Sequence, residues 1–357
     1  MNYSFIKTPS GADMYKLELP GRTEFNFTFK DSSILHCKSL VESSIKDQNA
    51  VITNSFIFGG PDAAPGTTGI NVIIRDKFCS KSEISSVQSF AISGTELTPV
   101  IFKGKNIGFV FENENFRECR LCGIVPENTF LARGEQARSV FNTIEEALRL
   151  FGFKFTDTVR TWFYNDHILD WYTEFNQIRT EFYNKTGIFG SLLPASTGIG
   201  AGNAAGAALC VNLLAIQTKN DKVTIREVLS PLQNPATSYR SSFSRAVKIS
   251  EPGFEKLLIS GTASIDKDGK TAHLDDPEKQ IELTMDVVKA ILESQGMDWS
   301  SIFRSIVYFT GKKFVPLFEN YLNRNKIRRI PAAYAFADIC RADLLFEIEL
   351  DAVKLKV

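Results

Sequence analysis

Two stretches of the chain have the spacing of an amphipathic helix. In residues 277–296, apolar side chains recur every three or four positions. This places Ile281, Met285, Val288, Ile291 and Leu292 on one helical face. Asp276 and Pro277 are typical of a helix start. Residues 136–151, followed by Gly152, form a similar stretch. The pattern predicts two helices, each with an apolar face that covers a sheet.

The two predicted helices belong to an internal repeat with a constant shift of 144 residues. The matching pairs are Gln136 and Gln280, Phe141 and Met285, Ile144 and Val288, Leu148 and Leu292, Gly152 and Gly296, Arg160 and Arg304, and Tyr164 and Tyr308. A repeat of this kind indicates tandem structural units. Because strands alternate with two helices per unit, we predict an α/β fold, an α+β two-layer sandwich in each unit. The recurrence of Arg160 as Arg304 favours a structural role for both arginines.

The repeat divides the chain into three predicted parts. Residues 1–104 form a strand-rich N-terminal region, in which the sequence shows no third copy of the repeat. Residues 105–235 are the first unit plus a linker, because the stretch 220–236 between the two units has the composition of a linker. Residues 236–357 are the second unit.

The last predicted strand, residues 345–351, alternates apolar and acidic side chains. Phe346, Ile348 and Leu350 point one way, and Glu347, Glu349 and Asp351 point the other. The apolar side can pack under the helices. The acidic side then faces either solvent or a wet interface between units, and the pattern alone favours a solvated face.

Composition and charge bound the function. The chain has 357 residues, of which 43% are hydrophobic and 23% charged, as in an ordinary soluble globular protein. Lysine plus arginine equals aspartate plus glutamate, at 41 each, which suggests neither nucleic acid nor an anionic membrane as a partner. The chain shows no secretory signal pattern and no run of 18 apolar residues, so we expect a cytoplasmic protein with free thiols.

Two local motifs are weak. Cys119 and Cys122 form a single C-x-x-C pair, whereas a zinc site needs a second pair or nearby histidines, and the three histidines are far apart in the sequence. Residues 200–206 are rich in glycine, but a strand follows them, and a dinucleotide loop requires a helix there. We therefore expect no metal and no cofactor.

Several longer strings resemble the YjgF/Rid family. They are Phe-Ser-Arg-Ala-Val at 243–247, Ile-Ser-Gly-Thr-Ala-Ser-Ile-Asp at 259–266, and Phe-Glu-Ile-Glu-Leu-Asp-Ala-Val at 346–353. The resemblance implies trimers of a small α/β unit with active sites in the clefts between units. Many members are imine deaminases with an arginine two residues after a proline on the penultimate strand. Here Pro331 is followed at that position by Ala333.

A further set of motifs resembles one branch of that family, the chorismatases, which remove pyruvate from chorismate. These motifs are Arg-Thr-Trp-Phe-Tyr at 160–164, Trp-Tyr at 171–172 followed by Arg179, Pro-Ala-Ser-Thr-Gly-Ile at 194–199, Tyr239 followed by Phe-Ser-Arg-Ala at 243–246, and Asp-Ile-Cys-Arg at 338–341. The resemblance spans about residues 105–357. Arg240 departs from it, because a small residue is expected there.

The resemblance implies a site whose chemistry suits an enol ether with two carboxylates. Cleavage needs a proton on the terminal methylene carbon, and the motif places the general acid at Glu347. Neighbouring carboxylates and a dianionic substrate would raise the pKa of that acid. Arginines suit carboxylates through their planar fork, and the matching motifs contain Arg179, Arg245 and Arg341. Cys340 occupies a position that determines the product in the family.

The other implied site residues supply hydroxyl groups, rings or exposed backbone for substrate binding. They are Tyr172, Ser196, Thr197, Gly198, Tyr239, Gly261 and Ala263. Cys340 favours 3-hydroxybenzoate as the product, and Ala263 argues for hydrolysis to a dihydroxycyclohexadiene carboxylate. A Rid-like imine or enamine hydrolase and a non-catalytic metabolite-binding protein are the alternatives. If residues 1–104 supply a third sheet, one chain mimics the trimer and can be monomeric; otherwise a homo-oligomer is expected.

Overall fold

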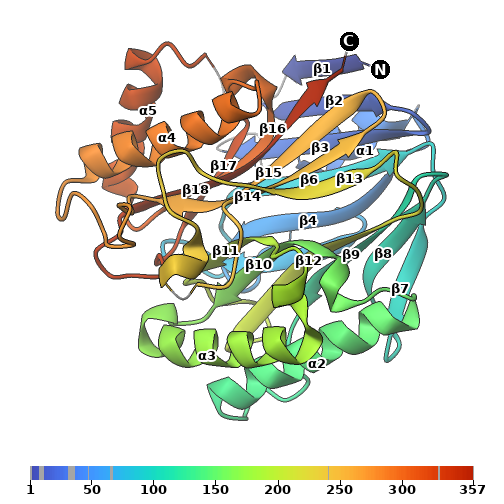
Figure 1. Ribbon diagram of the computed structural model, residues 1–357, viewed down its shortest axis with the longest axis horizontal. Helices are drawn as coiled ribbons and strands as arrows, with labels where there is room; N and C mark the ends of the chain where they lie inside the picture. Colours follow the sequence, from blue (N-terminus) through green and yellow to red (C-terminus); the bar gives the residue numbers. More distant parts are fainter. Residues whose placement is uncertain are drawn as a thin grey trace.

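The computed structural model describes residues 2–7, 12–30, 37–46, 48–64, 67–239, 241–328 and 330–356. Its strands form three six-stranded sheets, with helices on their outer sides (Figure 1). This arrangement is α+β, as predicted, and the tandem units of the sequence repeat are the second and third sheets with their helices.

The strands follow one another sheet by sheet. The first sheet has β1 (Asn2–Lys7), β2 (Asp13–Leu19), β3 (Arg22–Lys30), β4 (Val51–Gly59), β5 (Ile70–Arg75) and β6 (Ile84–Ser93). The second has β7 (Thr98–Phe102), β8 (Lys105–Glu112), β9 (Phe116–Ile124), β10 (Thr158–Asn165), β11 (Ala195–Ile199) and β12 (Leu209–Thr218). The third has β13 (Thr224–Val228), β14 (Ala246–Glu251), β15 (Phe254–Ala263), β16 (Ile302–Phe309), β17 (Ala332–Phe336) and β18 (Phe346–Leu355).

All three sheets have the same strand order. The first sheet reads β1-β2-β3-β6-β4-β5, and the other two repeat this order with their own six strands. In each sheet only the fourth and fifth strands pair in parallel. The register also slips at the same place, just before Asn54, Arg160 and Arg304. The N-terminal region is therefore a third copy of the unit, which the sequence did not reveal.

The three sheets close into a ring around a pseudo-threefold axis. The fifth strand of each unit contacts the next unit, through β11 with β15, β17 with β3 and β6, and β5 with β9. Phe58, Tyr164 and Tyr308 occupy equivalent positions in the three sheets and are all buried. The hydroxyls of Tyr164 and Tyr308 lie 3.3 Å apart, and the ring of Phe58 packs edge-on against Tyr308. One chain thus forms a pseudo-trimer.

The sheets begin earlier in the sequence than the predicted units. Strand β7 belongs to the second sheet but precedes residue 105, and β13 lies inside the stretch 220–236 that has a linker composition. Both are edge strands with mostly exposed or half-exposed side chains. Such strands carry little of the apolar alternation from which a strand is recognised in a sequence.

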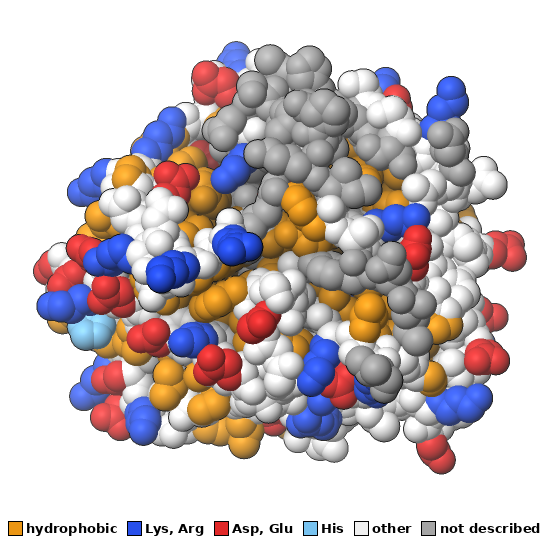
Figure 2. Space-filling model, turned by 90° about the horizontal axis from the view of Figure 1, so that it is seen from above, with side chains coloured by type: hydrophobic (Ala, Val, Ile, Leu, Met, Phe, Trp, Pro, Cys, Tyr) orange, Lys and Arg blue, Asp and Glu red, His pale blue; other side chains and the backbone are white. Residues whose placement is uncertain are grey.

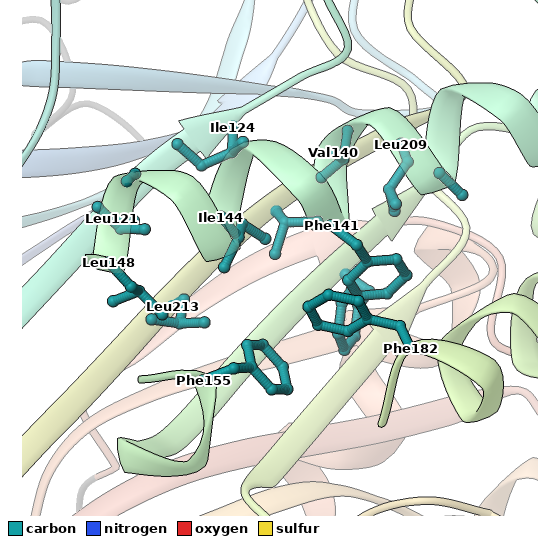
Figure 3. Close-up of a cluster of buried hydrophobic side chains, with 14 of the residues drawn as sticks. Leu121, Ile124, Val140, Phe141, Ile144, Leu148, Phe155, Phe182, Leu209 and Leu213 are labelled. Carbon is teal, nitrogen blue, oxygen red and sulfur yellow. The ribbon is translucent and has the colours of Figure 1, made fainter. Parts of the chain in front are cut away.

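The helices pack their apolar faces on the sheets, as predicted. Helices α2 (Arg133–Leu150) and α3 (Ile168–Thr186) cover the second sheet; α4 (Pro277–Ser294) and α5 (Val315–Arg324) cover the third; α1 (Cys37–Lys46) packs on the first. Figure 3 shows Val140, Phe141, Ile144 and Leu148 of α2 facing the side chains of β9 and β12. Helix α2 begins three residues earlier than expected, because its N-cap, Ala132, lacks a side chain that signals a start.

The acidic face of β18 is buried between sheets and is not solvated. Glu347, Glu349 and Asp351 are 4%, 0% and 8% exposed. The outer surface is different in kind: on the face drawn in Figure 2, basic and acidic side chains are interspersed, in line with the zero formal net charge.

Candidate active site

A cavity lies between the second and third sheets and gathers most of the residues that the motifs implied. It encloses about 620 Å³ of space, part of it open to solvent, which is in the usual range for a small-molecule site. Of the twelve predicted residues, eleven line it: Tyr172, Arg179, Ser196, Gly198, Tyr239, Arg245, Gly261, Ala263, Cys340, Arg341 and Glu347. They come from α3, β11, β15, β18 and the loops before β14 and β18.

Glu347 is the carboxyl group of this cavity. It is the second residue of β18, opposite Tyr308 on β16 and Ala263 on β15. Its side chain is almost fully buried, and its carboxylate has no hydrogen-bond or ion-pair partner among the residues that the structure describes. Burial raises the pKa of Glu347 to about 8; the nearby Glu349 adds to the rise, and the Arg160 guanidinium opposes it. Glu347 is therefore protonated near neutral pH and can donate a proton.

Gly261 makes room for that carboxyl group. A Cβ atom at position 261 would lie 2.0 Å from the Glu347 Oε1 atom, far inside van der Waals contact. The register of β15 against β18 shifts between Ile259 and Thr262, so Gly261 lies in an irregular part of the strand pair. The absence of a side chain at Gly261 leaves space for the Glu347 carboxyl group next to β15.

Glu349, two residues further along the same strand face, has a different environment. Its carboxylate forms ion pairs with Arg160 of β10 and Arg304 of β16, and all three side chains are fully buried or nearly so. Burial opposes ionisation, but the two guanidinium groups outweigh it and lower the pKa of Glu349. Of the two glutamates in this motif, Glu347 is thus a buried protonated acid and Glu349 is a buried ionised carboxylate. The structural role expected for Arg160 and Arg304 agrees with these contacts.

The arginines of the cavity lack a carboxylate partner within the described part of the chain. Arg179 is 3% exposed; it donates to Asn176 Oδ1 over 2.8 Å, while its Nε atom has no partner. Arg245 is 4% exposed and donates to the carbonyl oxygen of Asn234. Burial lowers the pKa of Arg245, and the neighbouring Arg341 acts in the same direction. Buried cations without counter-ions are costly, and an anionic ligand would remove that cost.

Cys340 and Tyr172 lie beside the acid. Burial raises the pKa of the Cys340 thiol to about 12; nearby Glu347 adds to the rise, and a hydrogen bond with Tyr172 opposes it. Burial also raises the pKa of Tyr172. Both groups are therefore neutral near pH 7, and they form a weakly polar wall next to the carboxyl of Glu347.

Thr197 is the one predicted residue outside the cavity lining. Its hydroxyl accepts a hydrogen bond from Arg160 Nη2 over 2.8 Å and another from the Gly261 backbone N–H over 3.1 Å. It therefore joins the second sheet to the third behind the cavity. Alternate residues of a strand point to opposite faces, so Thr197 faces away from Ser196 and Gly198. The motif alone does not tell which of the two faces meets the cavity. Arg240 lies outside the described residues.

Four lining residues were not among those predicted: Ser241, Phe243, Ile265 and Leu344. Phe243 belongs to a quoted motif, so it could have been found. The other three carry no chemical signal in the sequence, since a serine or an aliphatic residue near a motif is common in any fold.

A larger cavity, of about 1180 Å³, lies among the three sheets and includes Trp162, Arg304 and Asp351 in its wall. Its charged groups pair with one another, for example Lys256 with Glu24 over 2.5 Å and Arg120 with Glu118 over 2.7 Å. The smaller cavity combines a buried acid with arginines that have no carboxylate partner among the described residues, so its chemistry and not its size identifies it as the candidate site. None of the helices within the described ranges is long and apolar enough to span a membrane.

Comparison with known proteins finds chorismatases among the proteins similar to this chain. A chorismatase of Streptomyces rapamycinicus is 27% identical over 254 residues, which are 63% of this chain and 71% of that protein. A 3-hydroxybenzoate synthase of Streptomyces hygroscopicus is 25% identical over 242 residues, 60% of this chain and 68% of that protein. The crystal structure of a chorismatase shares the fold, with a TM-score of 0.64 and 18% identity, over 92% of this chain and 98% of that one. No protein-family model matches the chain.

The sequence relatives and the shared fold confirm the resemblance drawn from the motifs. The protein is built as a YjgF/Rid-like pseudo-trimer with a site between two of its units. Its sequence and its fold resemble those of the chorismatase branch of that superfamily.

Proposed function

We propose that this protein removes pyruvate from chorismate, with Glu347 as the general acid. The observation that carries the proposal is a buried carboxyl, with its pKa raised to about 8, in the same cavity as three arginines that lack carboxylate partners among the described residues. A dicarboxylate with an acid-sensitive enol ether fits this combination of groups. The relatives named chorismatase support it.

The proposed mechanism starts with proton transfer from Glu347 to the terminal methylene carbon of the enol ether. The resulting oxocarbenium ion then has two fates. Attack by water gives pyruvate and a dihydroxycyclohexadiene carboxylate. Attack by the ring hydroxyl, followed by aromatisation, gives pyruvate and 3-hydroxybenzoate without consuming water.

We infer that 3-hydroxybenzoate is the product. The neutral pair of Cys340 and Tyr172 beside the acid gives the ion a weakly polar neighbour, and one relative is a 3-hydroxybenzoate synthase. Ala333, where many Rid deaminases have an arginine, is fully buried in an apolar cluster and is not part of the cavity, which argues against Rid-type chemistry.

The proposal is tested by incubating purified protein with chorismate. Pyruvate is followed with a coupled dehydrogenase assay, and the second product is identified by chromatography against both standards. A stoichiometric yield of 3-hydroxybenzoate supports the full proposal; the diene diol would leave the pyruvate step intact and reassign the fate of the ion. Absence of pyruvate would refute the proposed function.

Since one chain supplies every lining residue, we also propose that a monomer is sufficient for activity.

The activity should fall as the pH rises through about 8. A general acid works in its protonated form, and the folded-state pKa of Glu347 is raised to about 8, so the active form predominates below that pH and is lost above it. The measurement is the pH profile of kcat/KM, which reports groups of the free enzyme. An alkaline limb near pH 4–5, the ordinary range for a glutamate, would contradict the assignment.

Replacing Gly261 with alanine should lower kcat roughly tenfold, because the added Cβ atom displaces the Glu347 carboxyl from its position. The matched control is Gly190→Ala, where a Cβ atom meets nothing within 4 Å. Steady-state rates and thermal unfolding are measured for both variants. Wild-type rates in a folded Gly261→Ala protein would show that the position of the carboxyl in this cavity is not critical.

A further inference from the structure

Behind the candidate acid lies an ion cluster that draws on all three units. Glu349 of the third unit pairs with Arg160 of the second and Arg304 of its own unit. Gln88 of the first unit accepts a hydrogen bond from Arg304 Nε over 2.9 Å. The equivalent of Glu349 in the second sheet is Asn212, and in the first sheet it is Gln88 itself. A buried carboxylate at this position is thus found in one unit of the three.

The same unit is the one that carries Glu347. The positions equivalent to Glu347 are Cys210 in the second sheet and Ser86 in the first. The acid and the ion cluster therefore occur together, and the two interfaces without the acid also lack the carboxylate behind it. Their separation along the strand is two residues, so both side chains are on the same face of β18.

Resting on the function proposed above, we propose that Glu349 is a positioning residue: it occupies Arg160, which would otherwise form an ion pair with Glu347, and so keeps the acid protonated and directed at the cavity. Arg160 is the cation that acts on Glu347, and it forms an ion pair with Glu349. Without the Glu349 charge, Arg160 would be a buried cation near a carboxyl group that could neutralise it, whereas Arg304 would keep its ion pair with Asp351.

The other charged groups around Glu347 do not favour its protonated form. The titratable and charged groups that face it are Arg160 on β10, Tyr308 on β16, Tyr172 and Arg179 on α3, Tyr239 and Arg245 before β14, and Cys340 and Arg341 in the loop before β18. The cations among them all favour an ionised Glu347. Glu349 is the one carboxylate of this neighbourhood, within the described residues, that favours the protonated acid.

The decisive variant is Glu349→Gln, which keeps the size and removes the charge. The titration of Glu347 should move at least about one pH unit lower, so the rate at pH 8 falls at least about fivefold and recovers toward the wild-type rate in acid. A purely structural defect would lower the rate at every pH and leave the position of the alkaline limb unchanged. Asp351→Asn is the matched control. Asp351 lies on the same strand face and pairs with Arg304 over 2.9 Å, but along the strand it is two residues further from Glu347 than Glu349 is.

A second variant and a second readout keep the test decisive. Arg160→Gln removes the cation, so the titration should move to higher pH, and an unchanged or lower titration would overturn the proposal even if Glu349→Gln does not fold. Isotope-edited infrared difference spectroscopy follows the protonated carboxyl of Glu347 directly, with Glu347→Gln to assign the band. This readout needs no substrate, so it separates a failure of the ion-cluster proposal from a failure of the chorismate proposal. An unmoved band in folded Glu349→Gln would overturn the proposal.

Discussion

Glu347→Gln should slow pyruvate release from chorismate by at least about 100-fold, while chorismate still binds. Protonation of an enol ether at carbon is slow without a positioned acid, and such acids contribute about 10²–10⁴ in rate. Glutamine keeps the size and the hydrogen-bonding reach of the side chain but cannot deliver the proton. The rigid strand β18 and the close approach of Gly261 hold the group in place, so no other carboxyl of the described chain takes its position.

The measurement is single-turnover pyruvate release at pH 7, together with chorismate binding by calorimetry. Glu349→Gln is the comparison, because the rate of pyruvate release should fall less in this variant at acidic pH, where Glu347 is protonated in either protein. A near wild-type rate in Glu347→Gln would place the proton donor elsewhere and end the proposed mechanism.

Arg179→Met should weaken chorismate binding about ten- to a hundred-fold, which corresponds to roughly 1.5–3 kcal/mol for one charge-assisted contact. Methionine keeps the apolar contacts of the side chain, which lies against Phe163, Phe175 and Tyr183. Because the wild-type guanidinium is buried without a carboxylate partner in the described chain, the variant should unfold at the same temperature or a higher one. A loss of affinity with no loss of stability is the signature of a binding residue.

Binding is measured by calorimetry in the Glu347→Gln background, so that the ligand is not consumed. Arg138→Met is the matched control, since Arg138 is an exposed arginine of α2 that pairs with Glu181 over 3.2 Å. Unchanged affinity in Arg179→Met would remove this arginine from the site and leave the carboxylates to Arg245 and Arg341.

Eleven of the twelve residues implied by the motifs line one cavity, because they lie in strings whose spacing is fixed by strands and turns. The motif before β18 supplies Cys340 and Arg341, and the alternation in β18 puts Glu347 opposite the core-facing Phe346 and Ile348. The same reasoning could not separate Thr197 from Ser196, since which face of a short strand meets a cavity depends on the unit that packs against it.

The N-terminal unit shows the limit of the repeat argument. Its strand order equals that of the other two, yet its equivalents of Arg160 and Tyr164 are Asn54 and Phe58, and the shift of 144 residues does not reach it. The fold of a sheet depends on where apolar residues alternate, and many side chains meet that need. A third copy can therefore keep the topology after its recognisable residues have changed.

The apolar periodicity and the repeat were enough to predict the tandem units, the helices on their sheets and the acidic face of the last strand, and the family motifs implied which arginines could bind carboxylates. The packing of the three units buries this face, and it raises the pKa of Glu347 while it lowers the pKa of Glu349. The physical reason is that a pattern along one strand fixes which side chains share a face, whereas their ionisation depends on what lies opposite. Here Arg160 is 187 residues from Glu347 in the sequence (347 minus 160), and the ring of three sheets brings it to the acid.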